Sequence, residues 1–242
     1  MYEIAPPTPG GARATTLGRY AGVEPDRARS ALADAWRRHQ TLWHHRTVFT
    51  ARDMTKSALE ALGVVLDAER FEDLVRELED ESLAREVRAI GGARDALDTL
   101  ARSGTRIALI CDTGFSPGRV VRQLLDRVGL LRFLETTVFS DEIGVPKPDA
   151  TAFRTALAPL GVGPGDAVHV GDLRRSDVAG ARTFGMGSVR IRAHNDDGGD
   201  EPRPSSGVID CASAGCTPPC DRPEADAVVD SYEQMLGILG IV

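Results

Sequence analysis

Two aspartates, Asp172 and Asp177, follow a short apolar run in the stretch "AVHVGDLRRSD". The run predicts a buried strand, and Gly171 lets the backbone turn tightly where that strand ends. Asp172 is then expected at the carboxyl edge of the strand and Asp177 near the start of the next helix. Two carboxylates facing one small volume suit Mg²⁺, which takes one or two carboxylates together with waters and substrate phosphate. Alternatively, Asp172 is a turn residue and Asp177 caps its helix.

Polar residues of complementary chemistry follow two further apolar runs. "RIALI" precedes Cys111, Thr113 and Gly114, and a helix is predicted shortly after them. Hydroxyl groups and backbone N–H donors at a helix N-terminus form an anion-binding site. "TTVFS" precedes Lys147, which lies between two prolines that stiffen its backbone. The Lys147 ammonium is either a point charge for a phosphate or carboxylate, or a solvated surface group.

The elements that position these residues are expected to change in kind along the chain. Four segments between Pro25 and Arg102 have the period and composition of helices. After Gly104, short apolar runs alternate with helical segments. That alternation predicts an α/β fold with a parallel sheet covered by helices on both faces. Ligands of such sheets bind at the carboxyl ends of the strands.

Composition and charge narrow the classes of partner. The 242 residues are 42% hydrophobic and 27% charged, and no apolar run approaches the roughly 18 residues that span a bilayer. A formal net charge of −7 argues against a nucleic-acid binder, whose footprint is a basic face. The N-terminal stretch "MYEIAPPTPGG" shows no secretory signal, so a cytoplasmic location is expected. A small-molecule substrate is predicted, with no membrane or nucleic-acid partner, and the oligomeric state stays open.

Residues from about Gly91 to Val229 resemble the haloacid dehalogenase-like hydrolase superfamily. "LICDTG" is similar to the family's second motif, "SDEIGVPKPDATAF" to its third and "HVGDLRRSDVAGARTFGM" to its fourth. Most members are Mg²⁺-dependent phosphatases, and a Gly-Asp of this form resembles theirs rather than that of haloacid dehalogenases. The resemblance implies a Rossmann-like α/β core at residues 91–242 and a small α-helical cap at residues 23–90, after an N-terminal segment at residues 1–22.

The resemblance further implies a phosphatase that acts on a small phosphorylated metabolite. Asp172 would hold Mg²⁺, and Asp177 would support the metal or orient Lys147. Lys147 would offset negative charge between the phosphate and the nucleophile. Thr113 and neighbouring N–H groups would bind the phosphate oxygens. The family's second motif opens with Ser or Thr where this chain has Cys111, so whether Cys111 or Thr113 fills that position stays open.

The family's first motif, of the form Asp-x-Asp, has no counterpart in this sequence. In the family, the first of these aspartates attacks phosphorus and the second protonates the leaving group. Before the predicted cap, the sequence offers only Glu3 as an acid. The expectation is that the native start lies upstream of Met1 and restores the motif, and that the chain as given is inactive. The alternatives are a non-catalytic member that binds a phosphorylated ligand or a partner protein, and a haloacid dehalogenase.

The first long helical segment carries two tryptophans and several histidines. Trp36 and Trp43 share one helical face, with His39 nearby. Packing is expected for tryptophans in such a helix, and a substrate-facing role is the alternative. The histidines lack the i, i+4 spacing of a helical zinc pair, so no metal role is predicted for them.

Residues 194–223 are rich in Gly, Pro, Ser and Asp and predict a long flexible surface loop. Structural zinc sites generally use four ligands. Free thiols are therefore the expectation for the loop's three cysteines, with zinc binding as the alternative. These residues are Cys211, Cys216 and Cys220.

Overall fold

The computed structural model describes residues 1–4, 11–192 and 224–241. The chain forms two compact units, and each is described by itself. The first unit comprises Met1–Ile90, Cys111–Arg132 and Phe139–Pro146, and the second comprises Gly91–Ile110, Phe133–Val138 and Lys147–Val242. The boundaries given above for a cap and a core stay a prediction.

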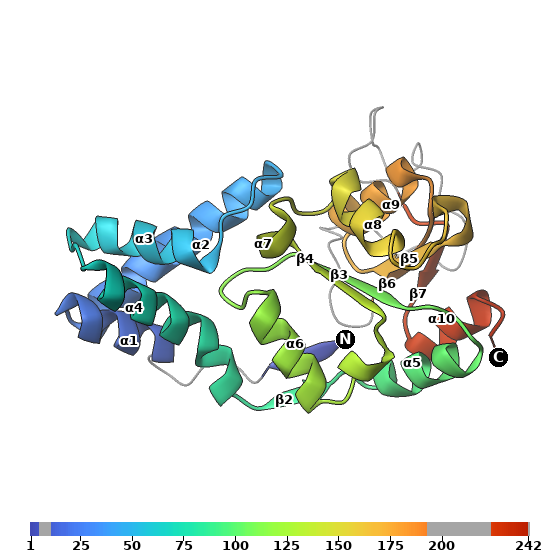
Figure 1. The fold of residues 1–242 in the computed structure, drawn as a ribbon, viewed down its shortest axis with the longest axis horizontal. Helices are drawn as coiled ribbons and strands as arrows, with labels where there is room; N and C mark the ends of the chain where they lie inside the picture. The colour runs from blue at the N-terminus through green and yellow to red at the C-terminus, as the bar shows by residue number, and fades with distance from the viewer. Residues whose placement is uncertain (5–10, 193–223, 242) are drawn as a thin grey trace. The chain divides into compact units, whose positions relative to one another are not determined.

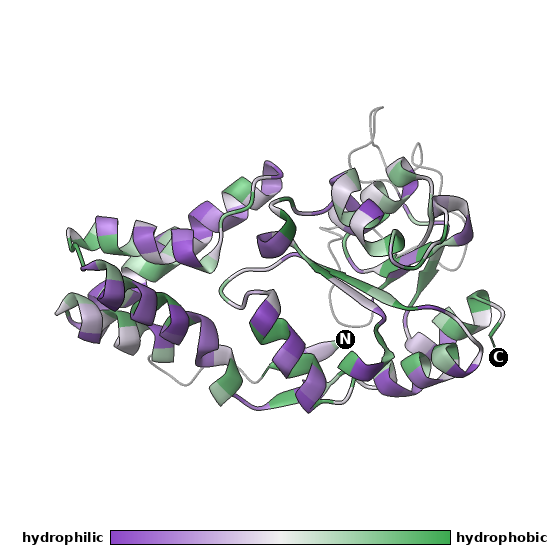
Figure 2. Cartoon of the chain, viewed as in Figure 1, coloured by the Kyte–Doolittle hydropathy of each residue, from purple (hydrophilic) through white to green (hydrophobic). Residues whose placement is uncertain are grey.

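Four helices of the first unit pack side by side and are called the helical bundle (Figure 1). They are α1 (Ala12–Ala21), α2 (Pro25–His44), α3 (Ala51–Leu62) and α4 (Ala68–Asp80). Their core contains the fully buried side chains of Leu17, Met54 and Leu74. Each helix carries both hydrophilic and hydrophobic residues (Figure 2), as expected for helices that bury one face. Burial of these apolar faces therefore holds the bundle together.

Local sequence explains where the bundle helices begin. Pro25 occupies the first turn of α2, where a missing N–H removes no helical hydrogen bond. Thr50 and Asp53 form a capping box at α3: Asp53 N–H donates to Thr50 Oγ1 at 3.2 Å, and Thr50 N–H donates to Asp53 Oδ2 at 2.9 Å. Asp67 caps α4 by accepting from the N–H of Arg70 at 2.9 Å. The predicted helices of this region are confirmed.

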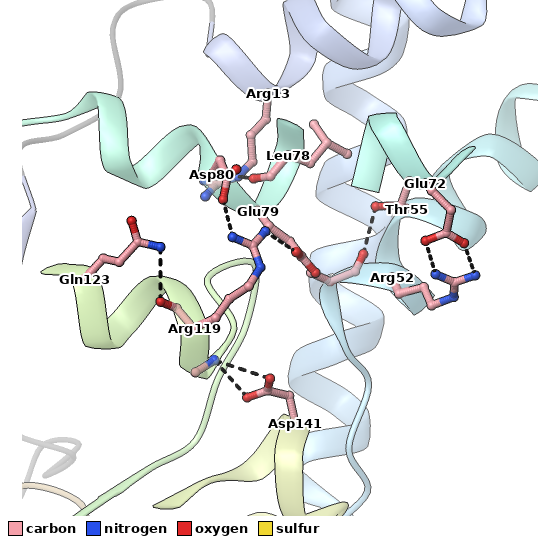
Figure 3. A network of polar contacts seen from close by, with 12 residues as sticks. Arg13, Arg52, Thr55, Glu72, Leu78, Glu79, Asp80, Arg119, Gln123 and Asp141 are labelled. Atoms are coloured by element: carbon pink, nitrogen blue, oxygen red, sulfur yellow. Dashed lines mark hydrogen bonds and ion pairs between the residues drawn. The ribbon is translucent and has the colours of Figure 1, made fainter. Parts of the chain in front are cut away.

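Ion pairs tie α4 to its neighbours within the first unit (Figure 3). Arg52 of α3 donates to both carboxylate oxygens of Glu72, at 2.7 and 2.5 Å. Arg119 of α6 (Gly118–Arg127) donates to Asp80 at 2.5 Å and to Glu79 at 2.6 Å. Both arginines are at least 40% exposed, so each such pair contributes less than about 1 kcal/mol.

Two strands, one before and one after the helical bundle in the sequence, form an antiparallel pair. Tyr2 of β1 (Tyr2–Ile4) lies opposite Ala89 of β2 (Val87–Ala89). Both β1 and α1 precede Pro25, in a stretch for which no element was named from the sequence. Three residues are too few to show strand periodicity, and α1 contains helix-disfavouring Thr and Gly that tertiary packing overrides. The first unit also contains η1 (Glu81–Ala84) and α7 (Ser140–Ile143). The third predicted helical segment, residues 67–87, ends early, because η1 follows α4 directly.

The second unit contains a parallel three-stranded sheet with β6 in the middle. Its strands are β5 (Val168–Gly171), β6 (Gly187–Ile191) and β7 (Ala227–Val229). Two helices lie on one side of this sheet and two on the other (Figure 1). They are α8 (Ala150–Leu157) with α9 (Ala179–Phe184), and α5 (Ala93–Arg102) with α10 (Tyr232–Ile238). The predicted α/β fold is confirmed.

Two further strands, β3 (Ala108–Cys111) and β4 (Thr136–Phe139), pair with each other. The remaining short elements are η2 (Leu131–Phe133), η3 (Pro164–Asp166) and η4 (Arg174–Val178). None of the helices in the described ranges has the length and apolar character needed to cross a membrane.

Candidate active site

The residues singled out in the sequence form two sets, one in each unit. The first set follows β3 and consists of Cys111, Thr113 and Gly114. The second set lies in the second unit and consists of Lys147, Asp172 and Asp177. Within this second set, the structure brings Lys147 and Asp177 into direct contact.

Lys147 and Asp177 form a buried ion pair. The Nζ atom of Lys147 lies 2.7 Å from Oδ1 of Asp177 and 3.3 Å from the carbonyl oxygen of Ile110. The two side chains are only 11% and 4% exposed. The alternative that Lys147 is a solvated surface residue is therefore wrong, because its ammonium is held inside the second unit by a carboxylate and a carbonyl.

His169 of β5 completes what we call the charged cluster: Lys147, Asp177 and His169. The Nε2 atom of His169 lies 2.9 Å from Oδ1 of Asp177. A carboxylate can only accept, so Nε2 carries the hydrogen in this contact. The N–H of Leu173 donates to the other oxygen of Asp177 at 3.1 Å. The Asp177 carboxylate thus accepts three hydrogen bonds and cannot move without breaking them.

Gly171 allows Asp177 to lie against the end of β5. A Cβ atom added to Gly171 would lie 2.3 Å from Cγ of Asp177, so any side chain there would displace the carboxylate. Between the two residues the chain makes one π-helical turn, η4, in which the N–H of Val178 donates to the carbonyl of Leu173 at 3.2 Å. Such turns are frequent at functional sites. Gly171 is the last residue of β5 and does not have a positive φ, so this close approach, and not a tight turn, requires glycine there.

The charges of the cluster keep Asp177 ionised. Complete burial alone would raise the pKa of its carboxyl group. The Lys147 ammonium and the His169 hydrogen bond outweigh burial, and the pKa of Asp177 lies well below its ordinary value. The carboxylate is therefore negative at neutral pH and provides the counter-charge of the Lys147 ammonium.

Asp172 directly follows β5 and is half-buried. Burial, and then the charge of Asp172, raise the pKa of Tyr232 in α10, which places these two side chains near each other. Among the residues that the structure describes, no group of three or more metal-binding side chains gathers in one place. Mg²⁺ needs only one or two protein carboxylates, so Asp172 remains a candidate ligand.

Side chains from α7 fix the loop that follows β3 in the first unit. The N–H of Thr113 donates to Oγ of Ser140 at 2.9 Å, and the Thr113 hydroxyl donates to Oδ1 of Asp141 at 2.9 Å. Asp141 also accepts from the N–H of Gly118, the first residue of α6, at 3.1 Å. Both hydrogen-bond donors of Thr113 are therefore engaged within the loop.

Three successive amides of this loop remain available. Within the described ranges, the N–H groups of Gly114, Phe115 and Ser116 donate no hydrogen bond. They come just before α6, and the N-terminal end of a helix favours anions. The structure thus supplies backbone donors where the sequence predicts phosphate binding.

Cys111 is half-buried at the end of β3. Its thiol donates to the carbonyl oxygen of Asp112 across 3.5 Å. Burial, and then the charge of Cys111, raise the pKa of Tyr2 in β1. A thiol is a weak donor, and this one already has an acceptor, so neither Cys111 nor Thr113 offers an unused side-chain donor in this structure.

The sequence analysis did not single out Ser140 and Asp141, although both directly follow the predicted strand "TTVF". Polar residues at that position were the available signal. The ring of His169 in β5 is satisfied by its hydrogen bond to Asp177. The predicted loop at residues 194–223, with Cys211, Cys216 and Cys220, lies outside the described residues. Its flexibility and the free thiols stay predictions, with zinc binding as the alternative.

Comparisons with known proteins agree on one family. The model of the haloacid dehalogenase-like hydrolase family matches residues 17–185. Haloacid dehalogenase-like hydrolase domain-containing protein 3 of Xenopus laevis is 30% identical over 176 residues, which cover 70% of this chain and 70% of that protein. Glyceraldehyde 3-phosphate phosphatase of Methanopyrus kandleri is 42% identical over 88 residues, but these cover only 34% of this chain and 38% of that enzyme.

A solved structure shares the fold. The HAD phosphatase from Thermococcus onnurineus superposes with a TM-score of 0.59 at 21% identity, covering 94% of this chain and 86% of the other. At that identity the likeness describes the fold alone. The family match over residues 17–185 and the relative from Xenopus laevis identify this chain as a member of the haloacid dehalogenase-like hydrolases.

Proposed function

We propose that this chain is a Mg²⁺-dependent phosphatase that acts on a small phosphorylated metabolite. The observation that carries the proposal is the buried charged cluster at the carboxyl end of β5, immediately beside Asp172 in the chain. Phosphoryl transfer depends on positioning and on fixed charges, and this cluster supplies both. The similarity to a glyceraldehyde 3-phosphate phosphatase supports the same class of reaction. The cytoplasmic location expected from the sequence belongs to this proposal.

Lys147 is the cation of the mechanism. Its ammonium offsets negative charge that develops between the phosphate and the nucleophile. Asp177 and His169 act through Lys147, because their hydrogen bonds hold the shared oxygen that orients the ammonium. No residue of this sequence is assigned as the nucleophile or the general acid, because the sequence contains no Asp-x-Asp motif.

The donor set fits Mg²⁺ at Asp172 better than at Asp177. Oδ1 of Asp177 already accepts from Lys147 and His169, and Oδ2 accepts from the N–H of Leu173. A cation at Asp177 would have to displace an ammonium 2.7 Å away. We therefore assign metal binding to Asp172 and the orientation of Lys147 to Asp177. When bound, Mg²⁺ neutralises charge on phosphate oxygens.

Phosphate oxygens are assigned to the amides of Gly114, Phe115 and Ser116. Thr113 supports this loop rather than donating to the ligand, because its N–H and hydroxyl are already bonded to Ser140 and Asp141. Three backbone donors that have no partner within the described residues are the groups that an incoming phosphate can satisfy.

Release of inorganic phosphate from a panel of phosphorylated metabolites tests the proposal. The full-length protein is assayed with Mg²⁺ and with a chelator, and chloride release from 2-chloropropionate is measured in parallel. We expect Mg²⁺-dependent phosphate release and no chloride release. Asp172→Asn is expected to lower kcat by about 10²- to 10³-fold, the loss typical when one preorganised electrostatic stabiliser of the transition state is removed.

Asp166→Asn is the matched control, since Asp166 is an exposed aspartate of η3 in the same unit. Its activity should equal that of the unchanged protein. Phosphate binding without turnover would favour the non-catalytic alternative, and chloride release would favour the dehalogenase.

A further inference from the structure

One face of α2 lies on the loop that follows β3, within the first unit. Trp36, His39 and Trp43 are spaced three and four residues apart, which places them on the same side of the helix. Nε1 of Trp43 donates to Oδ2 of Asp112 at 2.9 Å. A Cβ atom on Gly114 would lie 2.8 Å from Cζ3 of Trp36. This face therefore contacts the loop that carries the three available amides.

Packing alone does not account for this face. Trp36 is 40% exposed, and among the described residues it is the one aromatic residue with a large, exposed hydrophobic side chain. Its ring stacks on that of His39, with centroids 4.9 Å apart and planes 18° apart, and more loosely on Phe115 at 6.0 Å. The substrate-facing alternative that the sequence left open thus gains support from an aromatic surface that is ordered but not buried.

The ring of His39 has a defined orientation and a defined hydrogen. Its Nδ1 atom lies 2.7 Å from the carbonyl oxygen of Phe49, which can only accept. Nδ1 therefore carries the hydrogen, and in the neutral ring Nε2 presents a lone pair. Within the described residues, Nε2 of His39 makes no hydrogen bond.

The free nitrogen of His39 faces the phosphate-binding loop. Nε2 would lie 3.8 Å from a Cβ atom built on Gly114. The absence of a side chain at Gly114 lets the rings of Trp36 and His39 lie against this loop. An acceptor therefore stands beside the amide donors of Gly114, Phe115 and Ser116, where a phosphate ester would place the first atoms of its leaving group.

We propose that His39 determines substrate specificity by accepting a hydrogen bond from a hydroxyl group on the leaving group of a phosphate monoester. The substrate class is then a hydroxylated phosphate ester, with the hydroxyl close to the phosphate. This inference rests on the proposed function, because it takes the loop at Gly114 as the phosphate site. The ring of Trp36 keeps the imidazole plane in place.

The test compares two esters with the same carbon chain, glycerol 1-phosphate and n-propyl phosphate. The chain contains two tryptophans, Trp36 and Trp43, and both contact the loop, so their fluorescence reports binding without requiring turnover. Titrations are run on the full-length protein with Mg²⁺ at pH 8, and phosphate release is measured on the same samples. We expect glycerol 1-phosphate to bind about 2- to 10-fold more tightly, the effect of one net hydrogen bond.

His39→Ala is expected to abolish this preference while leaving the dissociation constant for n-propyl phosphate unchanged. His39→Gln, which retains a side-chain acceptor, should restore part of it. His45→Ala is the matched control, because His45 is exposed at the end of the same helix and should leave the ratio unaltered.

Each outcome decides a different question. A preference that survives in His39→Ala overturns the role of His39, whatever the activity. Discrimination that depends on His39 but comes without phosphate release supports the recognition role and counts against the phosphatase. Failure of both esters to bind overturns the inference together with the phosphate site.

Discussion

The loop that follows β3 and the turn that follows β5 are both organised by an aspartate, but the donors to the two carboxylates differ. Asp141 accepts from the Thr113 hydroxyl and the Gly118 amide, which are neutral groups. Asp177 accepts from the Lys147 ammonium and the His169 ring as well as from an amide. The first arrangement fixes a backbone, whereas the second fixes a charge.

This difference assigns distinct tasks to the two regions. Neutral donors are sufficient to hold a loop whose own amides are to bind a ligand. A reacting phosphate needs a cation in a defined place, and a buried ammonium stays there only when a carboxylate balances it. Mutations should therefore have larger energetic consequences around Asp177 than around Asp141, and the smallest at exposed pairs.

The largest effect is expected from Asp177→Asn. The substitution leaves the Lys147 ammonium, whose side chain is 11% exposed, without its counter-charge. The free energy of unfolding should fall by about 3–5 kcal/mol, as for other broken buried pairs. Urea denaturation measures it. The double variant Lys147→Met with Asp177→Asn should lose less than the single one, and an equal or greater loss would contradict the importance of the unpaired charge.

A moderate effect is expected from Asp141→Ala. The hydroxyl of Thr113 and the amide of Gly118 lose an acceptor. The loss of unfolding free energy should be about 1–3 kcal/mol, the cost of leaving polar groups unsatisfied. Asp126→Ala in α6 is the control, since Asp126 is exposed and should change stability little. If Asp141→Ala destabilised as much as Asp177→Asn in urea, the distinction between neutral and charged donors would not hold.

A fall in pH should weaken a third carboxylate contact, between Glu224 and Arg190, with a smaller loss of stability than a deletion causes. Burial raises the pKa of Glu224, but the hydrogen bonds from Arg190, at 2.8 Å each, outweigh burial and lower the pKa overall. The unfolded chain has the ordinary, higher pKa, so this stabilisation is present at neutral pH and is lost as pH falls through the acid range. The loss is smaller than for a deletion because a protonated carboxyl still accepts a hydrogen bond.

Chemical denaturation between pH 7 and pH 4 measures this dependence. Stability of the unchanged protein should fall more steeply with acid than that of Glu224→Gln, and the two curves should converge. Parallel curves would show that Glu224 does not contribute to the pH dependence.

The smallest effect is expected at an exposed pair of the bundle. Arg52→Ala removes the contact with Glu72 in which both side chains are more than half exposed (Figure 3). The melting temperature should change little, corresponding to less than about 1 kcal/mol, and the difference should shrink further in high salt. A loss comparable to that of Asp177→Asn would erase the contrast between buried and exposed pairs.

Much of the fold was accessible from the sequence because its long elements carry their own periodicity. The amphipathic helices α2, α3 and α4 and the apolar strands β5 and β6 lie where the pattern predicts them. By contrast, β1 owes its existence to pairing with β2, far away in the chain, and a three-residue strand has no local signature. Likewise, α1 depends on burying Leu17 against its neighbours.

The candidate site was predictable as a set of positions but not as a set of contacts. The sequence indicated Lys147, Asp172 and Asp177, since they follow apolar runs. It left open whether Asp177 binds metal or orients the lysine, because that depends on side-chain geometry. Similarly, only the structure shows that the N–H and hydroxyl of Thr113 donate hydrogen bonds to side chains of α7, and that the ring of His39 faces Gly114.

The antiparallel pair of β1 and β2 has a consequence for how this protein can vary. Ile4 lies opposite Val87, and the carbonyl of Met1 accepts from the N–H of Ile90, so the chain departs toward the helical bundle and returns at adjacent points. A segment whose two ends meet can be lengthened, shortened or exchanged with little disturbance to what flanks it. We therefore expect sequence changes to be tolerated best at bundle positions that make no contact outside it, whereas α2 and the end of α4, which contact the loop after β3 and α6, should tolerate fewer changes.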